Sequence, residues 1–119
     1  MGNAFAHGVE RPKHGGIMGR GDESVSVEFV LEKGVVSVYV EDHEKDVPIP
    51  AEKVKEAWLS VTGSGRTPQQ VRLAPAGGNR LSASGLSVRV GDRMSVRLVL
   101  LDGTESNLLV VFREAAPRR

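Results

Sequence analysis

The stretch that decides the fold runs from Ser24 to Glu41 and reads SVSVEFVLEKGVVSVYVE. In its first half, apolar side chains occupy every second position from Val25 to Leu31, and Ser24, Ser26 and Glu28 point to the other face. After the polar turn signal Glu32-Lys33-Gly34 the alternation resumes from Val36 to Val40. Successive side chains of a strand point to opposite faces, so each half predicts a half-buried strand, and the short turn predicts that the two pair as a hairpin.

The same period of two recurs through the rest of the chain. The 18 valines, against two isoleucines and ten leucines, favour strands because the branched Cβ packs well on a pleated surface. The apolar positions that we expect to be buried are Val27, Phe29, Val38, Leu59, Val61, Leu73, Val96, Leu98, Val110 and Phe112.

Turn signals separate these segments at intervals of 8 to 12 residues. They include Gly63-Ser64-Gly65, the run from Pro75 to Asn79, and Gly91-Asp92, which follows an alternating stretch from Leu86 to Val90. About seven short strands at this spacing predict an all-β, antiparallel β-sandwich of immunoglobulin-like type, with a Greek-key barrel as the alternative. The likeness is one of architecture, because the chain has no cysteine for the inter-sheet disulfide of true immunoglobulin domains.

Length and charge exclude several kinds of protein. With 119 residues the chain can build one core, and its net charge of +1 argues against nucleic acid as a partner. The longest apolar run, Leu108 to Phe112, falls far short of the approximately 20 residues of a membrane-spanning helix. The serines lack a nucleophile elbow or a plausible relay, so we expect no enzyme.

The chain divides into a domain and two flanking segments. Residues 1–23 contain six glycines and mixed charges without periodicity, which predicts a flexible N-terminal arm over residues 1–15. The sandwich is expected over residues 16–113, with a first short strand at Ile17 and Met18, and residues 114–119 form a frayed tail.

The arm also carries a processing signal. Ala4-Phe5-Ala6 has the small-x-small pattern of a signal-peptidase site, although the charged and apolar regions that should precede it are absent from the sequence. We interpret Met1 as a start placed inside a longer precursor, so that the mature, periplasmic protein begins at His7. Its α-amino group beside the imidazole would chelate Cu(II).

The candidate metal ligands are the three histidines and two neighbours. Imidazole is the commonest protein ligand for copper, zinc and nickel, which makes His7, His14 and His43 candidates. The carboxylate of Asp42 could supply an oxygen ligand to an ion bound by His43, and the thioether of Met18 would suit Cu(I). In the expected strand order His14 and His43 lie about 20 Å apart, because strands rise about 3.3 Å per residue. We therefore expect His43 to form the site on the domain, with Asp22, Glu23 or Met18, and His14 to form a separate, weaker one.

Several motifs together resemble a family of small bacterial periplasmic proteins associated with heavy-metal efflux and copper resistance, many of unknown function. The motifs are His14-Gly15-Gly16, Glu28-Phe29-Val30, the run from Val38 to His43, and the run from Leu73 to Leu81. The chain departs from the family pattern after His43, where Glu44-Lys45-Asp46 replaces an expected Gly-Lys-Pro, which puts the role of that loop in doubt. The resemblance implies a non-enzymatic periplasmic accessory, with His14 and His43 as candidate ligands and efflux components as partners.

Two hypotheses about function follow. The first is a periplasmic accessory protein that binds a transition metal, with copper favoured, in support of efflux or resistance. The second is a metal-free β-sandwich module for protein–protein interaction, since a histidine in an acidic loop is ordinarily a solvated residue.

Overall fold

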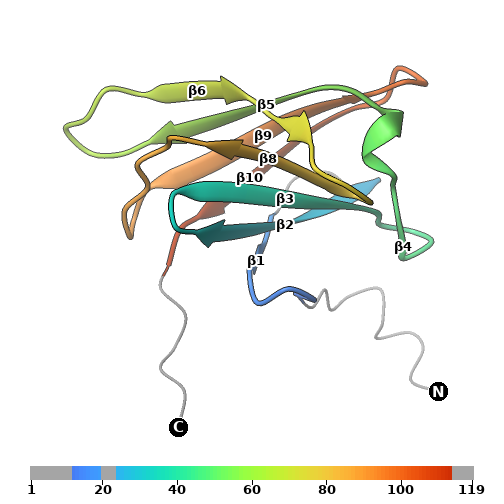
Figure 1. The fold of residues 1–119 in the computed structure, drawn as a ribbon, viewed down its shortest axis with the longest axis horizontal. Coiled ribbons are helices and arrows are strands. Elements are labelled where there is room, and N and C mark those ends of the chain that lie inside the picture. Colours follow the sequence, from blue (N-terminus) through green and yellow to red (C-terminus); the bar gives the residue numbers. More distant parts are fainter. Residues whose placement is uncertain (1–11, 20–23, 114–119) are drawn as a thin grey trace, which may run out of the picture.

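A computed structural model describes residues 12–19 and 24–113, which form β-strands and one short 3-10 helix (Figure 1). The elements in chain order are β1 (Ile17–Met18), β2 (Val25–Glu32), β3 (Val35–Asp42), β4 (Val47–Pro48), η1 (Ala51–Lys53), β5 (Val54–Thr62), β6 (Gln69–Arg72), β7 (Ala74–Pro75), β8 (Arg80–Ser84), β9 (Arg93–Leu100) and β10 (Glu105–Val111). Three of these strands, β1, β4 and β7, have only two residues each. The longer strands match the predicted number of about seven.

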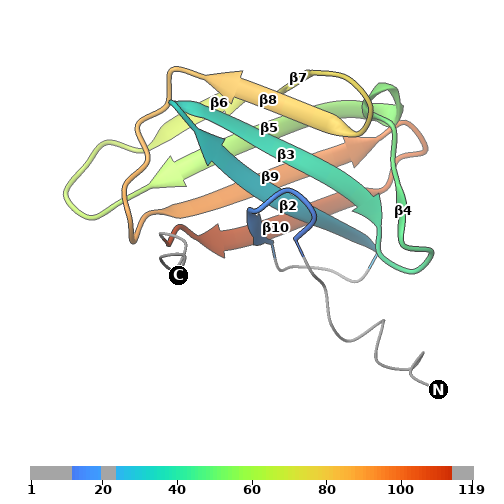
Figure 2. The same ribbon diagram turned by 60° about the horizontal axis from the view of Figure 1, so that its bottom comes forward.

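The strands form two sheets that stack face to face (Figures 1 and 2). Sheet A has the order β1-β2-β3-β8-β7, with β4 paired to the end of β3, and sheet B has the order β10-β9-β5-β6. Every pair is antiparallel, so the predicted antiparallel β-sandwich is confirmed. Within the part of the chain that the structure describes, no helix has the length and apolar character needed to cross a membrane.

The hairpin predicted from the deciding stretch is β2 and β3. Their register runs from Val25 opposite Asp42 to Glu32 opposite Val35, and positive φ angles at Lys33 and Gly34 close the two-residue turn. This register places Glu28 directly opposite Tyr39 on the outer face of sheet A.

The core lies between the two sheets and contains nearly all of the positions that alternation predicted. Nine of the ten predicted positions are buried, and Val27, Val38, Leu59 and Leu98 have no exposed surface. The tenth, Phe112, is only partly buried because it follows the last residue of β10.

The alternating stretch from Leu86 to Val90 does not form a strand, contrary to what its pattern suggests. The side-chain amide of Gln69 accepts from the N–H of Ser87 at 3.0 Å and donates to its carbonyl at 2.8 Å. These bonds occupy the backbone groups that a neighbouring strand would pair with. Leu86 is still buried, whereas Val90 is 59% exposed.

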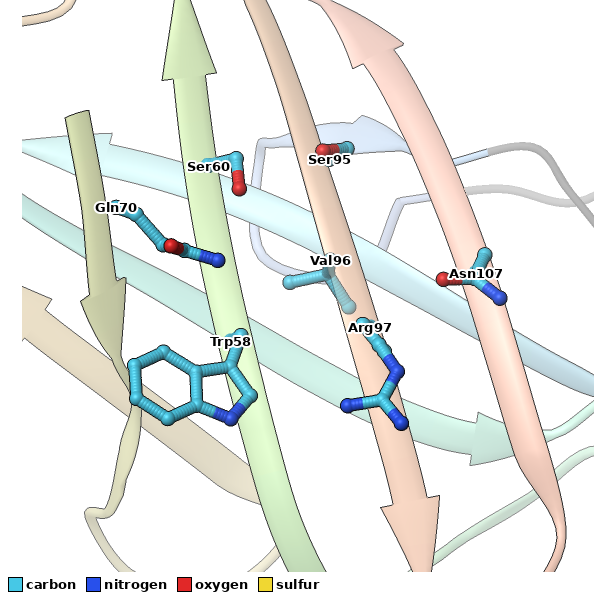
Figure 3. Close-up of a pocket in the computed structure, with 7 residues that line it drawn as sticks. All are labelled: Trp58, Ser60, Gln70, Ser95, Val96, Arg97 and Asn107. Carbon is cyan, nitrogen blue, oxygen red and sulfur yellow. The ribbon is translucent and has the colours of Figure 1, made fainter. Parts of the chain in front are cut away.

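The outer faces of the two sheets differ. The segment around β1 lies over the outer face of β2, in front of sheet A in Figure 2. The outer face of sheet B instead carries polar side chains and Trp58 (Figure 3).

Candidate functional site

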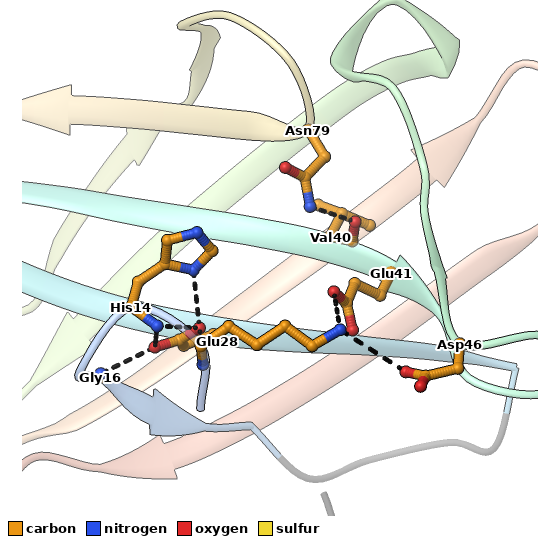
Figure 4. Close-up of polar contacts among 8 residues, drawn as sticks. His14, Gly16, Glu28, Val40, Glu41, Asp46 and Asn79 are labelled. Carbon is orange, nitrogen blue, oxygen red and sulfur yellow. Dashed lines mark hydrogen bonds and ion pairs between the residues drawn. The ribbon is translucent and has the colours of Figure 1, made fainter. Parts of the chain in front are cut away.

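The carboxylate of Glu28 is the centre of the most elaborate polar cluster on sheet A (Figure 4). Although it lies on the outer face of β2, Glu28 is only 4% exposed, because the N-terminal segment covers it. Backbone N–H groups of Lys13, His14 and Gly16 donate to its two oxygens at 2.9, 2.9 and 2.7 Å. The carboxylate of Glu28 thus holds the backbone of residues 13–16 on the outer face of sheet A.

The ring of His14 lies against the same carboxylate. Its Nδ1 is 3.0 Å from Oε1 of Glu28, and the ring stacks on Tyr39 with centroids 3.6 Å apart and planes 7° apart. Two contacts therefore fix the plane and the direction of the imidazole, while 40% of the side chain stays exposed.

The charge state of Glu28 determines how the imidazole is used. Burial alone would raise the pKa of the Glu28 carboxyl, but the His14 ring and the N–H groups of Gly16, Lys13 and His14 outweigh it and lower this pKa. An ionised carboxylate can only accept hydrogen bonds, so Nδ1 of His14 carries the donated proton. In the neutral ring, Nε2 is then the nitrogen with a free lone pair.

The two glycines after His14 let the backbone come this close. Gly15 has a φ of 77°, and this left-handed conformation helps to turn the flanking N–H groups toward one anion. A Cβ at Gly16 would overlap the carbonyl of Phe29 and lie 2.8 Å from a methyl of Val30. The His14-Gly15-Gly16 motif therefore has a structural reason that composition alone did not reveal.

Lys13 adds a second, more exposed contact. Its Nζ is 2.8 Å from Glu41 and 3.7 Å from Asp46, and the Glu41 hydrogen bond is the main reason that the pKa of Lys13 is raised. Lys13 and His14, which we assigned to the arm, are therefore held by sheet A.

His43 and Asp42 lie elsewhere, at the end of β3. The N–H of His43 donates to the carbonyl of Ser24 at 3.0 Å, and Oδ1 of Asp42 accepts from the N–H of Lys45 at 2.9 Å, which closes the turn. His43 follows β3 directly and lies four residues after Tyr39, about 13 Å away at the usual rise of a strand. The structure therefore places His14 and His43 at different points of sheet A, and His14 lies at the middle of β2 rather than at the Leu31 end that we expected.

Of the remaining predicted ligands, the structure describes only Met18. Met18 pairs with Glu28 in the β1–β2 register and lines a small hollow beside Lys13 and Glu41. His7, Asp22 and Glu23 lie outside the described residues, as does the tail 114–119. In residues 12–19 and 24–113 there is no group of three or more histidines and acidic residues that could hold a metal ion.

One motif of the resemblance has a clear role in the fold. Asn79 donates its side-chain amide to the carbonyl of Val40 at 2.8 Å and accepts the Val40 N–H on its own carbonyl at 3.0 Å. Leu81 is buried, and Arg80 donates to Ser37 at 2.9 Å. The run from Leu73 to Leu81 therefore forms β7, an edge strand of sheet A, and the turn that joins it to β8.

Sequence reasoning did not single out Glu28, Tyr39 or Trp58 as site residues. The alternation puts Glu28 and Tyr39 on the outer face of the predicted hairpin, where an acidic and an aromatic side chain are ordinary. The available signal was that the chain has one tyrosine and one tryptophan, both at outward positions of predicted strands.

Comparisons with known proteins support the fold. A scan against models of protein families finds no match, and a search of curated proteins finds none either. Among solved structures, the chain resembles the Br derivative of BhCBM56, a carbohydrate-binding module and β-sandwich, with a TM-score of 0.52 and 9% identity. The match covers 82% of this chain and 100% of that one. At this identity the likeness shows a shared sandwich architecture.

Proposed function

We propose that the chain is a non-enzymatic periplasmic accessory protein that binds a transition metal, copper above all, in support of metal efflux or resistance. The observation that carries the proposal is the pairing of His14 with the buried carboxylate of Glu28. Metal-binding histidines characteristically donate their second ring nitrogen to a carboxylate, which fixes the tautomer and raises the basicity of the ligating nitrogen.

In this arrangement His14 supplies one ligand, Nε2, and the rest of the cluster positions it. Tyr39 holds the ring plane, and Glu28 holds the Nδ1 proton. Imidazole suits Cu(II), Ni(II) and Zn(II), and a bound ion here would be stored or passed on rather than used in catalysis.

One imidazole is a weak site, so the proposal needs at least one more ligand. The sequence supplies His7, seven residues earlier, and the α-amino group that processing before His7 would create. The relative importance of the two domain histidines is then the reverse of the expectation from sequence, because His14 is the one whose ring is oriented by a carboxylate.

A titration tests the proposal. One equivalent of Cu(II) should broaden the imidazole NMR signals of His14 first, and His14→Ala should weaken binding by tenfold or more, about 1.4 kcal/mol. His43→Ala is the matched control and should leave this equivalent unchanged. Equal losses from both variants, or no broadening of His14 at one equivalent, would contradict the proposal.

The second candidate function is a metal-free β-sandwich module for protein–protein interaction. It is favoured by the structural role of the Asp42-His43 pair at the end of β3, because Oδ1 of Asp42 accepts from the N–H of Lys45 and the N–H of His43 donates to the carbonyl of Ser24. If the folded protein bound no Cu(II) in this titration, the interaction module would be the function that remains.

A further inference from the structure

The outer face of sheet B contains a depression of about 380 Å³, at the small end of the range for ligand sites. Its floor is low because the short side chains of Ser60 and Ser95 face each other across β5 and β9. Taller side chains stand around this floor in Figure 3, namely Trp58, Gln70, Arg97 and Asn107.

The strand register explains why these side chains meet. Trp58 is paired with Arg97 on one side and with Arg72 on the other, and Asn107 is paired with Arg97. One row across the sheet therefore presents an indole, two guanidinium groups and an amide. The adjacent row presents Gln70, the two serines and Leu109.

The indole of Trp58 is held in place before any ligand arrives. Its Nε1 donates to Oε1 of Glu56 at 2.9 Å, and the guanidinium of Arg72 lies 5.8 Å from the ring centroid. A ring fixed at both its edge and its face loses little freedom on binding, which favours a flat ligand that packs against it.

The charges of the depression are balanced. Arg97 is the charged side chain in its lining, and its Nε donates to Glu105 at 2.7 Å. A polyanion such as nucleic acid would need several uncompensated cations. The amide and hydroxyl groups offer both donors and acceptors, so an apolar ligand would leave them unpaired.

We propose that this face binds a neutral oligosaccharide, independently of the metal site. A sugar ring has a C–H-rich face that packs on an indole and a rim of hydroxyls that amides, hydroxyls and guanidinium groups can bond. Trp58 is the stacking platform, and Gln70, Arg97 and Asn107 bond the hydroxyls.

Binding can be followed directly, because Trp58 is the only tryptophan of the chain. The metal-free protein in EDTA is titrated with cellohexaose, laminarihexaose and maltohexaose, with glucose for comparison. At least one hexasaccharide should change the fluorescence saturably at millimolar concentrations. No response to any of them would overturn the proposal, as would binding confined to a sulfated oligosaccharide.

Variants then locate the site by calorimetry. Trp58→Ala should weaken binding at least tenfold, and Ser95→Leu, which fills the floor while keeping the surrounding side chains, should do the same. Val111→Ala is the matched control, because Val111 is 38% exposed on the same outer face of β10 but pairs with Arg93, which does not line the depression. Unchanged binding by both test variants, with native circular dichroism, would place the ligand elsewhere. His14→Ala should bind the sugar normally, so this result and the copper result can fail separately.

Discussion

The two outer faces of the sandwich use the same kind of strand in opposite ways. On sheet A, Tyr39 is covered by a ring from its own chain, and the neighbouring Glu28 is sealed by backbone N–H groups. On sheet B, Trp58 stands beside an open depression lined by short serines. The alternation that builds both sheets therefore does not decide how each outer face is used. On sheet A the polar groups bond to residues of the same chain, and on sheet B the polar side chains around the depression stay open to solvent.

The largest expected effect comes from removing the anion of sheet A. Glu28→Ala takes away the acceptor of the Lys13, His14 and Gly16 N–H groups, and hydrogen bonds to a charged group contribute about 1.5 to 3 kcal/mol. We expect a loss of about 2 kcal/mol in urea denaturation and release of residues 12–19.

The matched control is Glu41→Ala, which removes only the half-exposed Lys13 contact and should cost less than about 0.5 kcal/mol. Equal losses of stability in the two variants would mean that the backbone hydrogen bonds to Glu28 stabilise sheet A no more than an exposed ion pair does.

Acidification should release the arm without mutation. The pKa of Glu28 is lowered in the folded protein, so the unfolded chain takes up the proton first as the pH falls. The stability that Glu28 adds is therefore complete above its ordinary pKa of 4.5 and is lost as the pH falls through the lower, folded-state pKa. The amide signal of Gly16 measures this, and Glu28→Gln should abolish the transition; an unchanged transition in that variant would assign it to another group.

A smaller effect is expected from the aromatic stack. Tyr39→Ala removes the platform of the His14 ring and should cost about 1 kcal/mol, the usual size for a stacked pair. Tyr39→Phe keeps the ring and should cost little. The His14 ring-proton shifts report the stack directly, and they should move in the first variant only; movement in neither would mean that the stack does not persist in solution.

The smallest effect belongs to sheet B. Arg97 and Glu105 form an ion pair with both side chains nearly half exposed, at 46% and 45%. Water and salt screen such pairs, so a double-mutant cycle at physiological ionic strength should give a coupling indistinguishable from zero. A coupling as large as the Glu28 effect would mean that sheet B is also stabilised by its surface charges.

The fold could be predicted because its signal is local. The period of two from Val25 to Val40 fixes which side chains face inward, and the Lys33-Gly34 turn fixes the pairing of β2 and β3. Alternation misleads at Leu86 to Val90, where a side chain of Gln69, about 18 residues away, occupies the backbone instead.

The candidate sites could be predicted only in part, because they depend on contacts between distant segments. The sequence indicated His14 as a candidate ligand, and that remains a prediction. It gave no sign that Glu28 accepts backbone N–H groups from the arm, since those groups are present whatever the side chains are. The depression requires Ser60 opposite Ser95, which only the pairing of β5 with β9 provides.

Capture of the arm through its backbone has a consequence for how the sequence can vary. Glu28 binds N–H groups of residues 13, 14 and 16, so most side chains at position 13 should be tolerated in a substitution library selected for arm docking. Proline should be rejected at all three positions because it has no N–H to donate. Position 16 should accept glycine alone, since any Cβ there meets the Phe29 carbonyl. The docking of residues 13–16 on sheet A therefore constrains the sequence chiefly by the residue types that it excludes at these positions.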